Sequence, residues 1–402
     1  PPGAAWSGAD LLSAAVAHNA QIAEAKAKYL TALAAQRAAR SPSGPSLTLT
    51  AEDAKESPQW GYGGAGDIPL DYGARRRVRI TTAQLQALQV LYDYGEAVWS
   101  VRTDLEKARI ALTAADAEIA LAGQAADARR LRAERLNQRV AAGQDARAVA
   151  ITAQGEAVAA ERRLSQARGR RETALVNLAK VLGVSPGVAA SLILAPVADR
   201  APPGDLGALR RDAALSRRDV LRAVADYDLA ENALRLQIAN QYPQLSIGPG
   251  YSYDHGVTKL PFNLSLALPP YDLNRRAIAQ AEAARAAAGR SLELAQANAL
   301  AAVDTAQAAL VTARLDQERT GGRDVPAAQR AADGAARAVK AGESDRIDDL
   351  AAQAALIEAR LSLLDAESAT KTATADLEDA LRRSFDPAEA AVMDKAMGEG
   401  AR

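Results

Sequence analysis

The chain repeats its own pattern at a spacing of about two hundred residues. The segment PSLTL at 45–49 returns as PQLSI at 243–247, and VAAGQ at 140–144 returns as VKAGE at 339–343. Each copy has the same order of expected elements: a helix, a pair of strands, a very long helix, a glycine turn and a second long helix. A repeat of this kind limits the possible folds more strongly than any local pattern. We therefore expect a pseudo-symmetric structure in which the strand pairs of the two copies join in one sheet.

The composition is typical of long helices. Among 402 residues, aromatic residues make up 4% and cysteine is absent, which excludes disulfides, thiolate metal sites and cysteine nucleophiles. The 49 basic and 49 acidic residues balance, so we expect no nucleic-acid partner. The sequence contains no run of 18 or more apolar residues, so it predicts no transmembrane helix. The start at Pro1 is typical of a mature or trimmed N-terminus.

We predict a first repeat over 1–200, a second over 201–384 and a peripheral C-terminal tail over 385–402. The first repeat opens with a helix from Ser7 to Arg40. In the first repeat we predict strands at 45–53 and 60–71 and a helical hairpin that turns near 143. In the second repeat we predict strands at the matching positions 243–254 and 259–269 and a hairpin that turns near 342.

A heptad pattern runs through the long helix that follows the first strands. Its apolar row is Leu91, Val98, Leu105, Leu112 and Ile119, and its companion row of mostly small residues is Val101, Ala108, Ala115 and Ala122. Small residues in one row of a coiled-coil seam let neighbouring helices approach closely. The pattern therefore predicts long coiled-coil hairpins.

The predicted strands have features of membrane strands. Each is about nine to twelve residues long, enough to cross a bilayer as a tilted strand. Most tyrosines lie at these strands, and we interpret the aromatic residues there as a candidate membrane girdle: Trp60, Tyr62, Tyr72, Tyr242, Tyr251, Tyr253 and Tyr271. Four strands cannot close a membrane barrel, and an open edge in lipid leaves backbone groups unsatisfied. If the strands span a membrane, several chains must build the barrel.

The second strand block carries a family resemblance. The wording YPQLSIGPGYSY at 242–253, LALP at 266–269 and NRR at 274–276 resembles the TolC-type outer-membrane efflux ducts (outer membrane factors), and the resemblance covers essentially the whole chain. It is most similar to the heavy-metal ducts of the cobalt–zinc–cadmium subclass. Two positions depart from the family pattern: Ala20 stands where the family commonly has proline, and the usual proline between Arg218 and Asp219 is missing.

This resemblance implies a fold and a set of partners. The fold would be mostly α with a small membrane β-barrel, twelve-stranded in a homotrimer, and with a long helical tube in the periplasm. The duct would sit in outer-membrane lipid of a Gram-negative bacterium and conduct substrate, heavy-metal cations in this subclass, passively to the exterior. Its partners would be a periplasmic adaptor (membrane fusion) protein and an inner-membrane transporter of the resistance-nodulation-division type. The resemblance implies no enzymatic activity and no cofactor.

The resemblance also assigns roles to the two hairpin turns. The candidate adaptor-docking tips are Ala142, Gly143, Gln144, Ala341, Gly342 and Glu343. Asp348 matches an acidic position that rings the family's constriction, and with Asp345 and Asp349 it forms a candidate gate. Val149 occupies the matching place in the first copy, so that half of the acidic pattern is lost. The competing interpretation of the three aspartates is a solvated helix N-terminus, which favours acidic residues.

Other functions are less well supported by the residues. We find no P-loop, no GxSxG or HExxH motif and no dinucleotide fingerprint. His18 and His255 each lack a second ligand nearby in the sequence, so no metal site is expected. The alternatives that stay open are an exit duct for multidrug or other small-molecule efflux, a duct for protein secretion, and a soluble coiled-coil scaffold.

Overall fold

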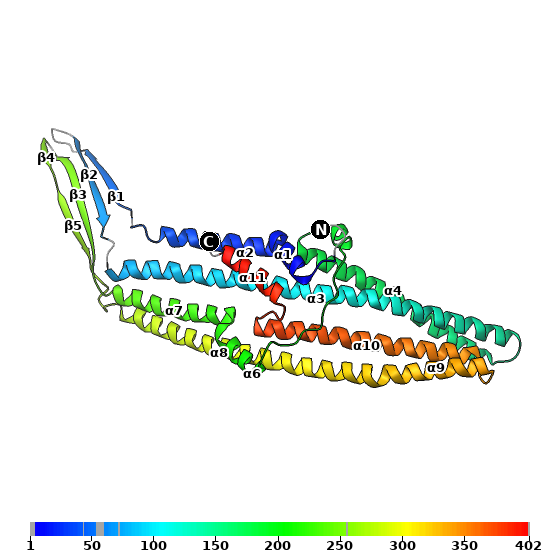
Figure 1. Cartoon of the computed structure of the whole chain (residues 1–402). Coiled ribbons are helices and arrows are strands. Elements are labelled where there is room, and N and C mark those ends of the chain that lie inside the picture. Colours follow the sequence, from blue (N-terminus) through cyan, green and yellow to red (C-terminus); the bar gives the residue numbers. More distant parts are fainter. Residues whose placement is uncertain (1–4, 43, 54–59, 71–72, 255, 401–402) are drawn as a thin grey trace. The chain divides into compact units, whose positions relative to one another are not determined.

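The computed structural model describes residues 5–42, 44–53, 60–70, 73–254 and 256–400, and is mostly helical with one small sheet (Figure 1). The chain forms two compact units. The sheet unit comprises Ala25–Tyr94 and Arg218–Ala297, and the helical unit comprises Pro1–Glu24, Gly95–Arg217 and Asn298–Arg402. Each unit therefore combines segments from both predicted repeats. The predicted class, mostly α with a small sheet, is confirmed.

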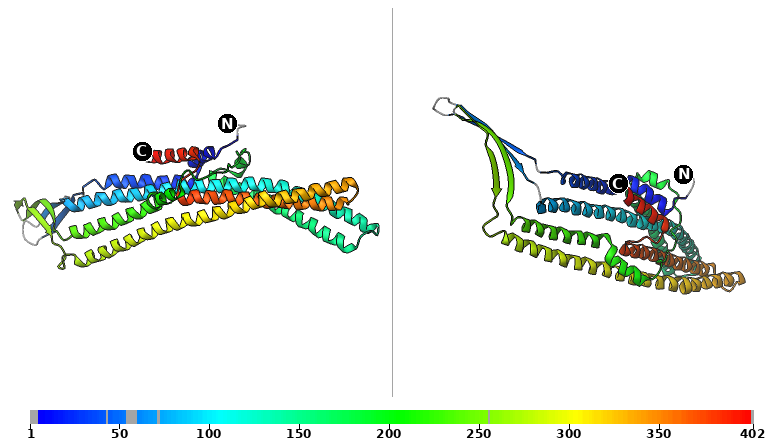
Figure 2. Two further views of the ribbon diagram at one scale, coloured as in Figure 1. Left: turned by 60° about the horizontal axis from the view of Figure 1, so that its bottom comes forward. Right: turned by 60° about the vertical axis from the view of Figure 1, so that its left-hand side comes forward.

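The sheet is antiparallel and joins strands from both halves of the chain (Figure 2). Its strands are β1 (Ser46–Asp53), β2 (Trp60–Pro69), β3 (Gln244–Asp254), β4 (Val257–Lys259) and β5 (Phe262–Ala267). Strand β2 pairs with β1 on one side and with β3 on the other, while β4 and β5 both pair with β3. The β2–β3 pairing confirms the expectation that the two strand pairs share one sheet.

The last predicted strand is wrong in one respect. We expected a continuous strand over 259–269, but it is divided into β4 and β5 around Pro261. Proline has no N–H to donate to the ladder, which interrupts a strand at that position. The carbonyl oxygen of Pro261 still accepts a hydrogen bond from Gly250 N–H at 2.8 Å, so the two short strands follow the same side of β3.

The first predicted helix, Ser7 to Arg40, is also divided. Helix α1 (Gly8–His18) ends and α2 (Ala20–Ala38) begins around Asn19, whose backbone is extended. The Asn19 side chain accepts hydrogen bonds from the N–H groups of Gln21 and Ile22 and donates one to Val181 O at 2.8 Å. An asparagine that caps a new helix and bonds a distant carbonyl achieves this break without the family's proline.

A second break occurs in the second half of the chain, again without a proline. Helix α6 (Leu206–Ser216) ends at Arg217, and α7 (Arg218–Ala239) follows. The buried Arg217 side chain donates to the carbonyl oxygen of Ala380 at 2.6 Å. A long-range hydrogen bond therefore accompanies the break.

Arginines after the first strand pair close the ends of neighbouring helices in the sheet unit. They lie at the start of α3 (Gly73–Ala141). Arg75 donates to Asn240 Oδ1 at 3.0 Å and to Tyr242 O at 2.6 Å, while Arg79 donates to the carbonyl oxygens of Ala39 and Ser41. These bonds satisfy carbonyl groups just after helices α7 and α2, where no intrahelical donor is available.

The helical unit contains two long hairpins. The first joins α3 to α4 (Arg147–Leu182), and the second joins α9 (Val325–Ala341) to α10 (Arg346–Leu381). The unit also contains the short helices α1, α5 (Pro186–Ala190), α6 and α11 (Pro387–Gly400). The predicted seam of α3 is buried here at Val98, Val101, Leu105, Ala108, Leu112, Ala115 and Ala122, which confirms the heptad interpretation for this part of the helix.

The long helix of the second half is interrupted, although its counterpart α3 is continuous. Helix α8 (Arg275–Arg319) passes into a π-helical turn, η1 (Thr320–Asp324), before α9. Val325 N–H bonds Thr320 O, one residue further back than in an α-helix. Pro326 has no N–H for the carbonyl of Gly322, which favours this irregular turn.

Candidate functional site

The sheet has one apolar face. Side chains alternate along a strand, and directly paired residues share a face. The register therefore gathers large apolar side chains on one side: Leu47, Leu49, Trp60, Tyr62, Ile68, Leu245, Ile247, Tyr251, Tyr253, Phe262, Leu264 and Leu266. Leu47 and Leu49 are 70% and 74% exposed, and Phe262 and Leu264 are 68% and 65% exposed. A face this apolar and this exposed requires an apolar environment or a partner.

The opposite face carries small and polar side chains. It consists of Ser46, Thr48, Thr50, Glu52, Gly61, Gly63, Ala65, Asp67, Gln244, Ser246, Gly248, Gly250, Ser252, Asn263, Ser265 and Ala267. Close contacts demand several of these glycines, since a Cβ at Gly248 would lie 2.8 Å from Gly66 O. The two faces thus differ as the lipid side and the water side of a membrane strand would.

The predicted girdle residues lie at both ends of this sheet. Trp60, Tyr62, Tyr251 and Tyr253 are near the strand turns, and the rings of Tyr62 and Tyr253 stack with centroids 5.2 Å apart. The exposed Tyr242 and Tyr271 are at the other end, where the strands meet the helices. Leucines and isoleucines of the apolar face lie between the two groups. Tyr72 is outside the described residues.

Both edges of the sheet are unpaired within the part of the chain that the structure describes. Strand β1 pairs only with β2, and β5 pairs only with β3. An exposed edge presents a row of free N–H and C=O groups to any strand that approaches it. These edges, together with the apolar face, are the features that a second copy of the chain would complete.

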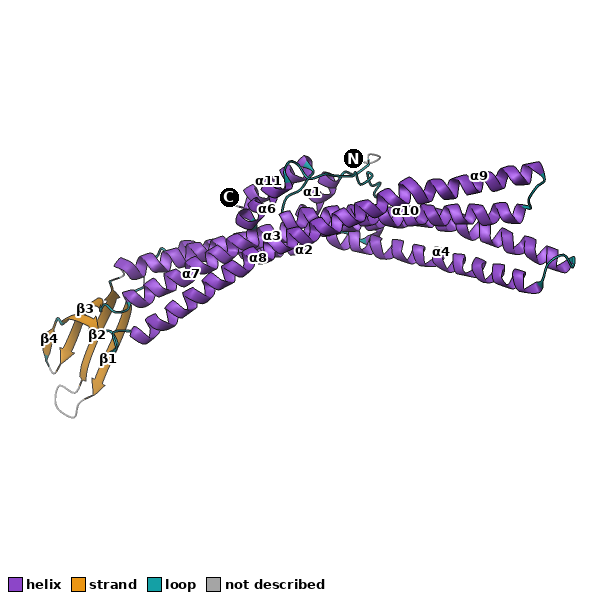
Figure 3. Ribbon diagram, turned by 90° about the horizontal axis from the view of Figure 1, so that it is seen from below, coloured by secondary structure: helices purple, strands orange, loops and turns teal. Residues whose placement is uncertain are grey.

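The two predicted tips lie at the same end of the helical unit (Figures 1 and 3). Gly143 and Gly342 both have a left-handed backbone, with φ values of 71° and 76°. Gly143 N–H bonds Val140 O at 3.0 Å, and Gly342 N–H bonds Val339 O at 3.1 Å. These are helix ends that glycine adopts without steric cost. The six candidate docking residues at 142–144 and 341–343 are all exposed.

The three candidate gate aspartates do not form one cluster. Asp349 is 6% exposed and accepts hydrogen bonds from Gln353 Nε2. Its carboxylate is therefore buried and does not face solvent. Asp345 caps α10 by accepting from Ile347 N–H. Asp348 is exposed and accepts from Ser344 Oγ at 2.7 Å. Of the three, only Asp348 keeps an exposed carboxylate without an arginine partner among the described residues.

Arg139 connects the two tips, a role that the sequence did not predict. It forms an ion pair with Asp145 of its own hairpin at 2.7 Å and a second one with Asp345 of the other hairpin. Burial raises the pKa of Asp345, but the hydrogen bonds from Arg139 and from backbone N–H groups outweigh it, so this pKa lies below its ordinary value. The sequence feature that could have identified Arg139 is its position as a basic residue in the last turn of the long helix α3.

An apolar cluster beneath the tips also joins the hairpins. Ile347 of α10 is buried among Ala133, Leu136, Ala150, Ala153 and Ala157 of the first hairpin. Ile347 packs against small alanines and Leu136, which holds the helices close at this point. The tips are thus joined by one ion-pair bridge and one apolar contact site.

Across the described ranges, no three His, Asp or Glu side chains come together to hold a metal ion, and His255 lies outside those ranges. Among the residues that the structure describes, no helix combines the length and the hydropathy needed to span a membrane.

One protein family matches most of the chain. The profile of the family described as outer membrane efflux protein matches residues 11–184 and 209–381. No curated protein sequence matches the chain. A membrane protein from Pseudomonas aeruginosa has a similar structure, with a TM-score of 0.77 at 21% identity over 92% of this chain and 89% of that one.

Two further solved structures share this fold. The CmeC outer membrane channel of Campylobacter jejuni gives a TM-score of 0.78 at 13% identity, over 98% of this chain and 88% of that one. The open MtrE outer membrane channel of Neisseria gonorrhoeae gives a TM-score of 0.75 at 18% identity, over 94% of this chain and 89% of that one.

Proposed function

The chain belongs to the outer membrane efflux protein family, and on this premise we propose that it is the exit duct of a tripartite efflux pump. The duct passively conducts substrate from an inner-membrane transporter and a periplasmic adaptor to the exterior. Its family places it in the outer membrane and among transport ducts rather than enzymes. The chain needs no cofactor for this role, because conduction requires only a continuous path.

The observation that carries this proposal is the two-faced sheet with two open edges. An apolar face suits lipid, but each unpaired backbone group at an edge costs several kcal/mol in the bilayer core, about the cost of a lost hydrogen bond there. The edges are satisfied if β5 of one copy pairs with β1 of the next. Counting β4 and β5 as one interrupted strand, three copies supply the twelve strands of the proposed homotrimer.

Cysteine cross-linking tests this closure, and the chain has no cysteine of its own. For a continuous apolar face, Leu47 of β1 must share a face with Phe262, Leu264 or Leu266 of the neighbouring copy. We expect Leu47→Cys to form intermolecular disulfides with a cysteine at one of these three positions. Thr48→Cys, on the opposite face, is the matched control and should not. A stable, folded monomer in native mass spectrometry would contradict the proposal.

The proposed cargo is heavy-metal cations. Support comes from the strand wording at 242–253, which resembles the cobalt–zinc–cadmium subclass, and from the exposed carboxylate of Asp348 near the tips. A strain that lacks the chain should become sensitive to zinc, cobalt or cadmium salts and regain tolerance when the chain is restored. Sensitivity to organic dyes and antibiotics instead of metals would favour a small-molecule duct.

The six exposed tip residues at 142–144 and 341–343 are the proposed adaptor-docking surface. Their turns are free of side-chain crowding, since nothing lies within 4 Å of a Cβ built at Gly143 or Gly342. A photo-crosslinking residue at Gln144 or Glu343 should capture the adaptor. The same residue at the exposed Asp394 of α11 is the control and should not capture it.

A further inference from the structure

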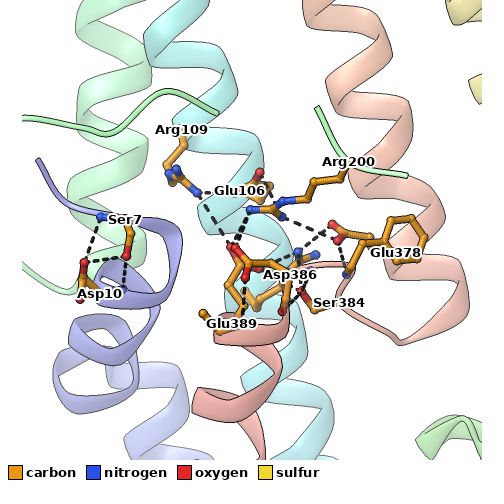
Figure 4. A network of polar contacts seen from close by, with 12 residues as sticks. Ser7, Asp10, Glu106, Arg109, Arg200, Glu378, Ser384, Asp386 and Glu389 are labelled. Carbon is orange, nitrogen blue, oxygen red and sulfur yellow. Dashed lines mark hydrogen bonds and ion pairs between the residues drawn. The ribbon is translucent and has the colours of Figure 1, made fainter. Parts of the chain in front are cut away.

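A buried group of charges in the helical unit lies outside the sheet and the tips (Figure 4). Glu389 of the C-terminal helix α11 is its centre. Arg102 of α3 donates from Nε and Nη2 to Glu389 Oε2 at 2.8 and 2.7 Å. Arg200, in the connection between α5 and α6, donates to Oε1 at 3.0 Å, and Arg109 Nη1 lies 3.9 Å from the same oxygen. Two arginines of α3 and one of the connection therefore converge on one carboxylate.

Burial makes this convergence energetically important. Arg102 and Glu389 are 1% and 2% exposed. The other acidic partners are Glu378, 2.7 Å from Arg102, and Glu106, 2.7 Å from Arg109. Without Glu389, the buried Arg102 and Arg109 would keep only these two buried carboxylates, and the partly buried Arg200 would also keep Asp386 at 3.4 Å. Removing one partner of a buried ion pair is strongly destabilising, because it leaves an uncompensated charge.

The N-terminus of the fold is built around the same carboxylate. Gly8, the first residue of α1, is buried, and a Cβ there would lie 2.3 Å from Glu389 Oε1 and 2.5 Å from Arg109 Nη1. Any larger residue at this position would therefore force the ends of the Glu389 and Arg109 side chains to move. The start of the first repeat, the connection between the repeats and the end of the chain thus meet at Glu389.

Helix α11 buries few of its own side chains. Apart from Glu389, its buried side chains within the described part are Met393 and Ala396. A helix of 14 residues is marginal on its own in water. The expectation of a peripheral tail is therefore wrong: the tail inserts a charged residue into the interior.

We propose that Arg102, Arg109 and Arg200 form a carboxylate-binding site, and that α11 is a latch that occupies this site with Glu389. The arginines offer more N–H groups than the carboxylate of Glu389 accepts, since Arg102 Nη1 and Arg109 Nε have no hydrogen-bond partner among the described residues. The ligand class is a carboxylate because three guanidinium groups surround a single pair of oxygens. This inference does not depend on the proposed function of the duct.

The charges around the site define its response to acid. They are Arg102, Glu106 and Arg109 of α3, Arg200 of the connection, Glu378 of α10, and Asp386 before α11. Burial raises the pKa of Glu378 despite the arginines, whereas at Glu389 the arginines outweigh burial and the pKa lies below its ordinary value. The stability contributed by a carboxylate with a lowered pKa is lost only as pH falls through that pKa. The arginines thus favour the charged form of Glu389 in the docked helix, and the stability that this carboxylate contributes is lost progressively as pH falls from the ordinary pKa of glutamate to the lowered one.

Hydrogen exchange of α11 in the full-length chain tests the latch. Glu389→Gln removes the charge, and Gly8→Ala crowds the carboxylate while keeping every charge. We expect each to speed exchange over 387–398 by at least about tenfold, because a lost buried partner costs more than one tenfold step. The matched controls are the exposed positions Asp394→Asn and Gly398→Ala, which should leave α11 protected. Unchanged protection in both test variants overturns the proposal.

Chemical rescue tests the carboxylate class. In Glu389→Ala, sodium formate should restore slow exchange around Arg102 and Arg109, whereas sodium chloride at equal ionic strength should not. Equal effects of the two salts would overturn the carboxylate assignment. If Glu389→Ala does not fold, recovery of folded protein in formate but not in chloride decides the same question.

Discussion

The two hairpin tips have the same backbone and different chemistry. Gln144 N–H bonds Arg139 O at 2.9 Å in the first tip, and Glu343 N–H bonds Ala338 O at 2.9 Å in the second. Beyond this shared turn they diverge, because the second tip carries the exposed Asp348 where the first carries Val149. Arg139 of the first then pairs with Asp345 of the second. The comparison teaches that a glycine turn sets the shape of a tip, while side chains outside the turn set its charge.

Replacing the turn glycine should have the largest effect. Gly342→Pro cannot adopt φ of 76° and loses the N–H that bonds Val339 O, so the second hairpin should be redirected and efflux abolished. Gly143→Pro should do the same if the turns are equivalent. The proposed trimer should stay intact by native mass spectrometry, because the sheet is untouched. Gly334→Ala, in open space on α9, is the control and should retain efflux. Adaptor cross-linking at normal yield in Gly342→Pro would argue against the tip assignment.

Truncating the apolar contact beneath the tips should have the next largest effect. Ile347→Ala removes the side chain that α10 contributes to this cluster and should destabilise the hairpin pair by about 2–5 kcal/mol, as for other buried aliphatic residues. Val149→Ala, at a position 44% exposed, should change stability by no more than about 0.5 kcal/mol. Thermal unfolding in detergent followed by circular dichroism measures both. An equal loss of stability in Ile347→Ala and Val149→Ala would mean that the two tips are packed alike.

Breaking the ion-pair bridge should have a smaller effect on stability and a clear one on conduction. Arg139 is 37% exposed, so each of its pairs contributes only about 0–1 kcal/mol. Arg139→Gln nevertheless removes the polar link between the tips and leaves only the apolar cluster to join them, so conductance in planar bilayers should rise. Arg130→Gln, which removes an exposed pair with Asp127 within one helix, is the matched control. Equal conductance of the two variants would show that the bridge does not restrain the tips.

The smallest expected effect concerns the charge difference between the tips. Asp348→Asn should reduce cation preference at low salt, and Val149→Asp should increase it by restoring an acidic residue to the first tip. Both changes should shrink as salt rises, because mobile ions screen exposed charges. Reversal potentials in a salt gradient measure them. If neither variant shifts the reversal potential, Asp348 is a solvated residue of a helix N-terminus.

Much of the fold could be predicted from local patterns. Alternation at Leu47 and Leu49 predicted a strand, and the seven-residue spacing from Val98 to Leu112 predicted a buried seam, because both depend on periodicity along one element. The breaks at Asn19 and Arg217 were missed. Each is accompanied by a hydrogen bond to a carbonyl more than 160 residues away in the chain, at Val181 or at Ala380, and no local pattern reports such a partner.

The candidate sites divide in the same way. Gly143 and Gly342 could be identified because a left-handed helix end favours glycine wherever it occurs. The three aspartates looked alike in the sequence, but one is buried, one is paired and one is exposed. Their difference depends on which residues of the other hairpin and of their own helix lie beside them.

The sequence by itself determined the element types, the turn positions and the two-faced character of the strands, because these follow from spacing and backbone preference. Only the tertiary structure decided which charges meet. Arg139 reaches Asp345, and Arg102 reaches Glu389, across 206 and 287 residues of chain. The reason is physical: the energy of an ion pair depends on distance and burial in space, and neither quantity is encoded in the local pattern of either residue.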